Sequence, residues 1–294
     1  MSLVINTNIS ALNGARNLSN TQDAQAQTFN RLSTGLRINS AKDDAAGLYL
    51  AQSQTKDIRG LEMATRNAGD GISMAQTAEG ALDQIQTNLQ RINELAIQSA
   101  NGTYDTAARN GLQKEVDQLT QEIARITETT EFNGQKLLSS AAESLTMQVG
   151  NQNGTGYRVD AGLSGGLVAA VKAGDVANAG DALSAIQGKG LDGTKAIDIS
   201  SQTAAQSAIA KTRSAIDGIS AERATFGAVM NRFEAVISGN QTYSENLQAA
   251  RSRVQDADFA EETSKLAKQQ VLQQAGVAAL GQANASTQVV LGLL

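Results

Sequence analysis

The sequence has 294 residues, a formal net charge of −5 and no cysteine, histidine, proline or tryptophan. Without Cys and His it cannot build disulfides, thiolate nucleophiles, Ser-His-Asp triads or the common zinc sites. We therefore predict that the chain is not an enzyme and uses no cofactor or metal. The absence of Pro leaves helices unbroken, which favours a mainly α-helical fold. The scattered Lys and Arg residues form no basic patch, so no nucleic-acid partner is expected.

Both ends of the chain carry sparse apolar stripes at helical spacing. Either helix alone would bury too little apolar surface to be stable, so each stripe is expected to pack on the other terminus or on another copy of the chain. The start of the chain lacks a basic segment followed by an apolar run, which argues against a secretory signal, and no apolar run is long enough for membrane insertion. The stripes are Ile5, Ile9, Leu12, Phe29, Leu32 and Leu36 at one end, and Leu272, Ala275, Ala279, Ala283 and Val290 at the other.

Three longer segments repeat apolar residues in alternating steps of three and four, which is typical of helices that pack side by side. They predict one elongated antiparallel helical bundle or coiled coil. The first seam spans residues 61–96, the second spans 112–126 and the third spans 205–254. Asn101-Gly102 and Gly111 lie between the first two seams and predict a reversal there.

The composition shifts towards Gly, Ala, Asp and Ser between residues 141 and 200. Alternating apolar residues flank Asn153-Gly154, which predicts a β-hairpin. Further on, Gly188 to Gly193 match the spacing of a dinucleotide-binding loop, but the expected strand-loop-helix context is missing, so we interpret them as a plain loop. Adjacent carboxylates such as Asp43 and Asp44 diverge on a helix, and helix-start chemistry explains them better than acid-base catalysis.

Four strings of the sequence are long and distinctive. They are RLSTGLRINSAKDDAAG from Arg31 to Gly47, RNAGDGISMAQTAEGALDQIQTNLQRINELAIQSANGT from Arg66 to Thr103, EFNGQKLL from Glu131 to Leu138, and DADFAEETSKLAKQQVLQQAGVAALGQAN from Asp256 to Asn284. These strings closely resemble the bacterial flagellins, and the resemblance covers about residues 1–150 and 200–294.

This resemblance implies a subunit that folds back on itself in a mainly α-helical fold with paired N- and C-terminal helices. Residues 1–44 and 256–294 would form the inner-tube helices, and residues 45–140 and 200–255 would form a helical rod. Residues 141–199 would supply a β-hairpin and a Gly-rich surface segment, without a large outer domain. The family is exported unfolded by the flagellar type III system, a route that suits a chain without disulfides or slow X-Pro isomerisation.

The resemblance also implies three groups of functional residues. The terminal helices would polymerise, and the rod would carry an innate immune receptor epitope. A loop from Thr34 to Lys56, between the terminal helices and the rod, would act as a spoke that contacts neighbouring subunits. The polymerisation residues are Leu3, Ile5, Ile9, Leu12, Phe29, Leu32, Leu272, Ala275, Ala279, Val290, Leu291 and Leu294; the spoke residues are Arg31, Arg37, Lys42, Asp43 and Asp44; the epitope residues are Arg91, Leu95 and Glu115.

The expected function is thus a structural subunit of the extracellular flagellar filament, which serves swimming motility. Its expected partners are other copies of itself, hook-filament junction and cap proteins, an export chaperone on the C-terminal helix, and a host Toll-like receptor. Two rival interpretations are a hook-filament junction protein, which should match poorly through the central rod, and a secreted adhesin, which should carry a large insert. An enzyme ranks last, since metalloprotease inserts need His.

Overall fold

The computed structural model describes residues 8–138, 146–160 and 197–291, except for the side chains of Asp160 and residues 286–291. Within these ranges the chain is mainly helical, as predicted, with two small antiparallel sheets. Gly188 to Gly193, Leu3, Ile5 and Leu294 lie outside the described residues. The helices are α1 (Ile9–Thr34), α2 (Ala45–Ser99), α3 (Thr106–Thr129), α6 (Gln202–Gln255) and α7 (Phe259–Leu291).

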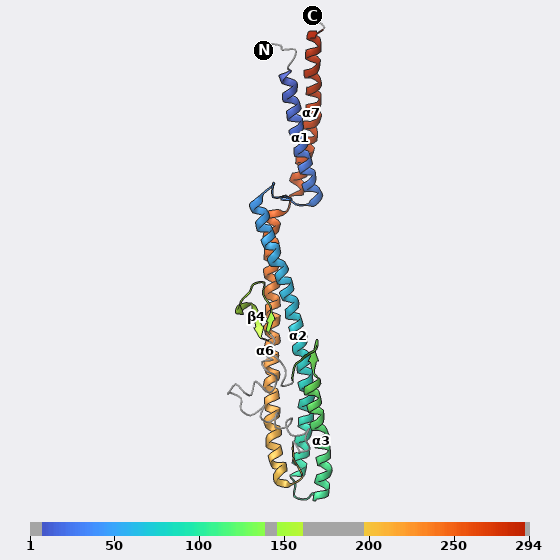
Figure 1. Ribbon diagram of the computed structural model, residues 1–294, viewed down its shortest axis with the longest axis vertical. Coiled ribbons are helices and arrows are strands. Elements are labelled where there is room, and N and C mark those ends of the chain that lie inside the picture. Colours follow the sequence, from blue (N-terminus) through green and yellow to red (C-terminus); the bar gives the residue numbers. More distant parts are fainter. Residues whose placement is uncertain (1–7, 139–145, 161–196, 292–294) are drawn as a thin grey trace. The chain divides into compact units, whose positions relative to one another are not determined.

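The chain divides into two compact units. One comprises Met1–Ile58 with Glu245–Leu294, and the other comprises Arg59–Ser244. The limits of both units fall inside α2 and α6. The domain limits inferred from the sequence, at residues 44 and 256, fall near helix ends and remain a proposal. Figure 1 shows α1 beside α7 in the first unit, and α2, α3 and α6 side by side in the second.

The three predicted seams form the core of the second unit, except for the end of the third seam, residues 245–254, which belongs to the first unit. All eleven seam residues of α2, from Leu61 to Ala96, are buried, and Val116 and Ile123 of α3 and Ile219, Phe226 and Phe233 of α6 are buried with them. Gly71 is part of this seam because a Cβ there would lie 2.8 Å from the Phe233 ring. The 3–4 spacing therefore predicts the packing faces of these three helices.

One basic residue in the α6 seam contacts acidic side chains of α2. The guanidinium of Arg223 lies 3.0 Å from Asp83 and 3.6 Å from Glu79, and its Nη1 also donates to Gln86. These contacts explain how a charged residue occupies a seam position between two helices. The partly exposed ion pairs contribute little energy, but they favour one alignment of α6 on α2.

The reversal between α2 and α3 lies at residues 100–105. Asp105 caps α3 by accepting a hydrogen bond from the Ala108 amide at 2.7 Å. The prediction was right for Asn101-Gly102 and wrong for Gly111, which lies exposed inside α3. A helix tolerates an isolated Gly at a cost of only about 1 kcal/mol, so Gly111 alone does not end it.

Two short hairpins lie within the described part of the chain. The predicted one pairs β3 (Thr146–Gln148) with β4 (Arg158–Asp160), and a 3-10 turn, Thr155–Tyr157, precedes β4. The other pairs β1 (Glu131–Phe132) with β2 (Gln135–Lys136) through Asn133 and Gly134, which have φ values of 51° and 78°. Positive φ at both turn residues defines the tight hairpin turn that Asn-Gly favours. This second hairpin was not predicted from the sequence.

Candidate assembly surfaces

The α1 and α7 helices pair in an antiparallel arrangement through small and polar residues. A Cβ on Gly14 would lie 2.9 Å from the Leu280 side chain, and one on Gly276 would lie 3.5 Å from Leu18, so the helices approach closely at both glycines. Near the other end of α1, the Gln269 amide donates to the hydroxyl of buried Thr28 at 3.1 Å. Most of the stripe predicted from the sequence, including Ile9, Leu12, Phe29 and Leu272, therefore lies outside the face that joins these two helices.

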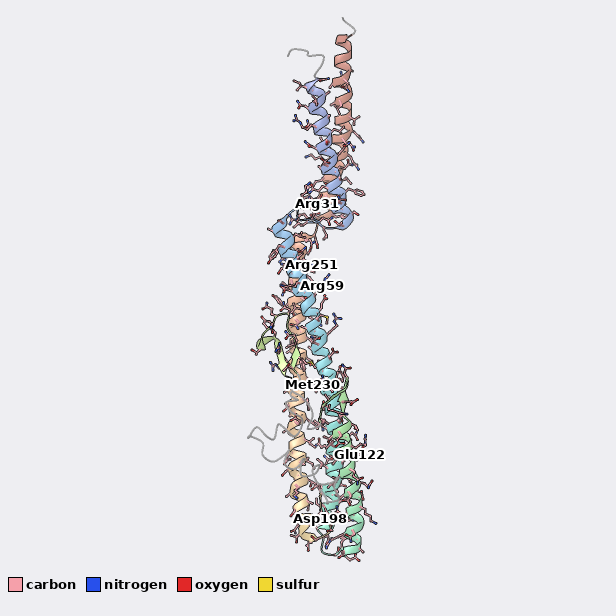
Figure 2. The ribbon with its side chains drawn as sticks, in the orientation of Figure 1. Arg31, Arg59, Glu122, Asp198, Met230 and Arg251 are labelled. Carbon is pink, nitrogen blue, oxygen red and sulfur yellow. The ribbon has the colours of Figure 1, made fainter. Side chains whose placement is uncertain are left out.

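A buried ion pair lies where α1 ends and α7 begins. Arg31 Nη1 is 3.5 Å from Glu262 Oε1, and Glu262 is 3% exposed. Lys265 reaches the same oxygen at 3.0 Å, and its hydrogen bonds to Glu261 and Glu262 raise the pKa of Lys265. Figure 2 labels Arg31 at this junction. Glu262 Oε2 and Gln269 Oε1 are buried without a hydrogen-bond partner among the described residues. Their lost hydration lowers the stability of the contact between α1 and α7.

Several large apolar side chains of the same two helices face outwards, whereas Leu18 and Leu280 pack against the glycines of the seam. Large side chains on both α1 and α7 are between about half and two-thirds exposed. Among the predicted polymerisation residues, Leu32 is half-buried, Ala275 and Ala279 are exposed, and the side chains of Val290 and Leu291 are not described. The exposed fractions are 65% for Ile9, 62% for Leu12, 63% for Phe29, 65% for Val271, 48% for Leu272 and 57% for Val277. Val271 and Val277 were missed because they lie outside the single stripe chosen on α7.

The connecting segments of the first unit are fixed by backbone hydrogen bonds. The Arg37 amide donates to the Gln255 carbonyl at 2.7 Å, and the Ala257 amide donates to the Gly35 carbonyl at 2.9 Å. Gly35 has a φ of 72° and donates its amide to the Arg31 carbonyl, a left-handed end to α1 that favours Gly. The two strands of the connection therefore lie antiparallel, bridged at Leu36 and Asp256.

Asp43 organises the loop that leads from α1 into α2. Its carboxylate accepts from Gln27 Nε2 at 2.8 Å, from the Ser40 amide at 2.9 Å and from the Asn39 amide at 3.2 Å. These hydrogen bonds, that from Gln27 first, lower the pKa of Asp43 from 3.8 to about 2. Asp44 accepts from the Gly47 amide at the start of α2, which is the helix-start role predicted for it.

The five predicted spoke residues do not form one cluster. Arg31 pairs with Glu262, Arg37 donates to the Val254 carbonyl, and Lys42 is exposed. Asp43 and Asp44 instead bond within their own loop. The structure thus divides these residues into ones that hold the loop in place and ones whose charge reaches solvent.

Changing Gln27 to Leu should raise the pKa of Asp43 towards 3.8, because it removes the hydrogen bond that lowers this pKa the most. The folded-state pKa lies below the unfolded value. The Asp43 contribution to stability is therefore present above about pH 4 and disappears as the pH falls through about 2. A carboxyl-detected NMR titration of Asp43 measures this shift. Gln22→Leu, at another exposed position of α1, is the control, and an equal shift in both variants would contradict the assignment.

The predicted receptor residues lie on α2 and α3. Arg91 Nε is 2.9 Å from Glu115 Oε1, and Arg91 Nη1 is 3.0 Å from Glu94. Hydrogen bonds to Glu115 and Glu94 raise the pKa of Arg91 above its ordinary value. The side chains of Arg91 and Glu115 are 51% and 44% exposed, whereas Leu95 is 1% exposed and belongs to the core. The structure therefore brings Arg91 and Glu115 together at the surface and places Leu95 beneath them.

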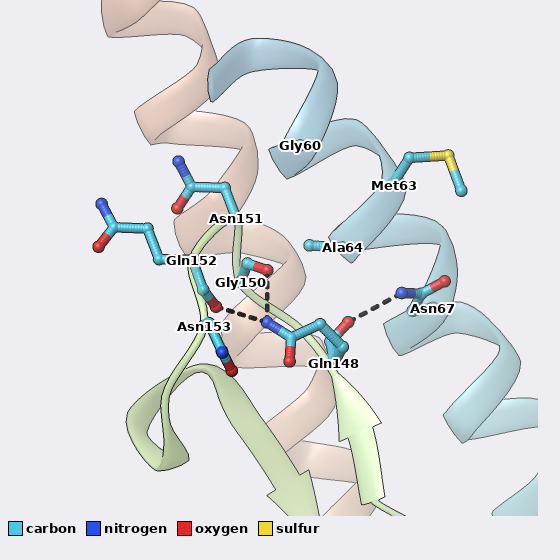
Figure 3. A pocket seen from close by; sticks show the side chains of 9 residues that line it. All are labelled: Gly60, Met63, Ala64, Asn67, Gln148, Gly150, Asn151, Gln152 and Asn153. Carbon is cyan, nitrogen blue, oxygen red and sulfur yellow. Dashed lines mark hydrogen bonds between the residues drawn. The ribbon is translucent and has the colours of Figure 1, made fainter. Parts of the chain in front are cut away.

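A pocket of about 340 Å³ separates α2 from the loop between β3 and β4. Figure 3 shows Asn67 donating to the Gln148 carbonyl across it, while Gln148 Nε2 donates to the carbonyls of Gly150 and Gln152. None of the residues that line this pocket is charged.

Across the described ranges, no cluster of acidic residues has the arrangement of a metal site. Among the same residues, no helix has the length and hydropathy needed to cross a membrane.

These features define a helical structural protein with outward apolar faces on its terminal helices, and comparisons with known proteins agree. The model of the bacterial flagellin N-terminal helical region matches residues 5–143, and that of the C-terminal helical region matches residues 209–294. The chain is 41% identical to a flagellin of Halalkalibacterium halodurans over 99% of this chain and all of that one. It is 40% identical to a flagellin of Bacillus subtilis over 99% of each chain.

The chain belongs to the bacterial flagellins. It is a structural subunit of the extracellular flagellar filament, not an enzyme, and flagellins self-assemble into this polymer. A solved flagellar hook-associated protein of Vibrio parahaemolyticus shares the fold, with a TM-score of 0.56, 13% identity and coverage of 73% of this chain and all of that one.

Proposed function

We propose that the outward apolar faces of α1 and α7 are the contacts through which copies of this chain polymerise. The observation that carries this proposal is the exposure of Ile9, Leu12 and Phe29 on a pair of helices already joined through another face. Burying apolar surface stabilises an interface by about 25 cal/mol per Å². The residues expected from the sequence at the chain ends, Leu3, Ile5, Val290, Leu291 and Leu294, would extend the same contacts.

The composition of the seam between α1 and α7 supports this proposal. The seam packs Gly14 and Gly276 against Leu280 and Leu18, includes polar residues such as Thr28, and leaves two buried oxygens without partners among the described residues. Each unpartnered buried polar group costs about 1–3 kcal/mol. The seam therefore stabilises the helix pair only weakly, and burial of the outer apolar faces between copies would add the stability that the seam lacks.

The loop expected at residues 34–56 is shorter in the structure, because α2 begins at Ala45. We propose that the loop from Gly35 to Asp44 acts as the spoke that meets neighbouring subunits. Its hydrogen bonds through Asp43 hold the backbone in one arrangement, while Lys42 is exposed to solvent. A loop with a fixed backbone loses little conformational entropy on binding. This supports a contact role for the loop and assigns to Asp43 the task of shaping it.

The composition of the chain and the exposed side chains of α7 also support proposals about export and accessory partners. We propose that the chain is exported unfolded by the flagellar type III system, an interpretation supported by the absence of Cys and Pro from its 294 residues. Before export, a chaperone on α7 would cover side chains such as Val271 and Leu272, which the structure leaves about half or more exposed. Junction and cap proteins would meet the same faces at the ends of the filament.

Deleting residues 256–294 is expected to abolish assembly while the second unit keeps its helices. The deletion removes α7 and with it half of the proposed contact surface. Purified full-length and truncated chains are mixed with filament seeds and examined by electron microscopy, and circular dichroism reports the remaining helix. Seeded growth of the truncated chain at the full-length rate would refute the proposed role of the terminal helices.

A second proposal concerns recognition by an innate immune receptor of the Toll-like class. The exposed pair Arg91 and Glu115 supports it, because two helices present adjacent charges at one surface. Leu95 is 1% exposed, so we propose that it supports the helix surface from below rather than touching a receptor.

Changing Arg91 to Ala should reduce receptor signalling by the monomer at least tenfold, because an interfacial charge pair is commonly worth more than about 1.4 kcal/mol. A reporter cell line that expresses the receptor measures the response. The control is Arg125→Ala, which removes an exposed arginine that pairs with Glu122 on α3. Equal responses of the two variants and the natural chain would rule out a receptor contact at Arg91.

A further inference from the structure

The three residues Ile197, Asp198 and Ile199 precede α6 and enter the core of the second unit. Ile197 is 2% exposed and Ile199 is fully buried, and both pack in the main apolar cluster with residues of α2, α3 and α6. Asp198 between them is exposed. Alternation of this kind is typical of an extended segment with one buried face.

Gln113 of α3 holds the backbone of this segment at two points. Its amide nitrogen donates to the Ile197 carbonyl at 2.7 Å, and its amide oxygen accepts from the Ile199 amide at 2.7 Å. A residue of a neighbouring parallel strand would make the same two hydrogen bonds around Asp198. The side chain of Gln113 thus takes the place of a neighbouring strand at this point of the described chain.

Two further contacts complete this arrangement. Ser99, which is fully buried at the end of α2, donates its hydroxyl to the Ile199 carbonyl. Asp117 accepts a second hydrogen bond from the Gln113 nitrogen at 2.7 Å, which fixes the orientation of the amide. Gln113 itself is 2% exposed, so its loss would leave buried backbone groups unpaired.

We infer that Gln113 and Ser99 are positioning residues that hold the chain at Ile197–Ile199, so that α6 begins at the same place whatever the length of the segment before it. Their hydrogen bonds go to backbone atoms and do not depend on the side chains of that segment. Just beyond the contact, Ser201 caps the start of α6 by accepting from the Ala204 amide. This inference is independent of how the terminal helices assemble.

The other end of the same part of the chain is held in a similar way. Asn67 of α2 donates to the Gln148 carbonyl at 2.9 Å, as Figure 3 shows, and Asn240 of α6 donates to the Val149 carbonyl at 3.0 Å. Side-chain amides of the helices therefore bind backbone carbonyls on both sides of residues 161–196. A contact to backbone atoms would tolerate differences in the length of that segment.

The test compares Gln113→Met, which keeps the size of the side chain but cannot hydrogen-bond in the same way, with Gln118→Met at an exposed position of the same helix. Each full-length chain is made with its natural segment and with about twenty Gly/Ser residues inserted within 161–196, a flexible extension. Hydrogen exchange is measured at the Ile199 amide, which bonds to Gln113, and at the Ala205 amide in the first turn of α6.

We expect exchange at Ile199 to rise at least about tenfold in Gln113→Met and to stay unchanged in Gln118→Met. The insertion should leave Ala205 exchange unchanged when Gln113 is present and should raise it when Met replaces Gln113. Equal effects of the insertion with and without Gln113, or unchanged exchange at Ile199, would overturn the inference. Should Gln113→Met fail to fold, Ser99→Ala removes a single hydroxyl and is judged by the same measurements.

Discussion

Replacement of Phe29 by glutamate is expected to abolish filament growth at concentrations where the natural chain assembles fully. Phe29 is 63% exposed in α1, while the neighbouring Thr28 faces α7. The substitution therefore leaves the α1–α7 seam intact and places a charge in the proposed contact between copies. Burying an unpaired carboxylate costs several kcal/mol, so the critical concentration should rise more than about a hundredfold.

Seeded assembly followed by sedimentation measures this critical concentration. Gln22→Glu provides the matched control, because it adds the same charge at an exposed polar position of α1. Phe29→Ala should lie between the two, since it loses apolar area without adding a charge. If Phe29→Glu assembled as readily as Gln22→Glu, the outer face of α1 would not be a contact surface.

Truncation of Phe233 to alanine is expected to give the largest loss of stability in the second unit. Phe233 is fully buried and packs with Ala68, Val149 and Val159, which joins α6 to α2 and to the β3–β4 hairpin. A Phe→Ala change in a core typically lowers the free energy of unfolding by about 3–5 kcal/mol, because it leaves a cavity. For a unit of this size the midpoint of thermal unfolding should fall by roughly 10 °C.

Thermal unfolding followed by circular dichroism at the helix band measures this loss. Phe259→Ala is the matched control, because it makes the same chemical change at a side chain that is 63% exposed at the start of α7. The control should change stability by less than about 0.5 kcal/mol. Similar losses in the two variants would mean that Phe233 does not support the packing described here.

Periodicity predicts the second unit well and the first unit poorly, and the reason is physical. In α2, apolar residues from Leu61 to Ala96 have one use, burial against neighbouring helices, so their spacing identifies the packing face. In α1 and α7, the apolar residues Leu12 and Leu272 lie outside the seam, and glycines such as Gly14 make the close approach. An apolar stripe reveals that a face needs a partner, and it does not reveal which partner.

Hydrogen bonds from polar side chains to distant backbone atoms could not be predicted from the sequence either. Gln113 occupies the position after Leu112 in a predicted seam, where it resembles any surface glutamine of an amphipathic helix. Its role depends on residues more than eighty positions away, at Ile197 and Ile199. The Asn133-Gly134 hairpin escaped prediction for another reason, since its strands have two residues each and offer no alternation to detect.

The close approach of Gly71 to the Phe233 ring makes the sizes of these two positions interdependent in evolution. A Cβ at position 71 would lie 2.8 Å from the ring, so a lineage that gains a side chain there must also lose bulk at position 233. A side chain gained first at position 71 would overpack the core, and bulk lost first at position 233 would leave a cavity. The two positions should therefore vary together among flagellins, with Gly opposite a large aromatic residue and Ala opposite a smaller one.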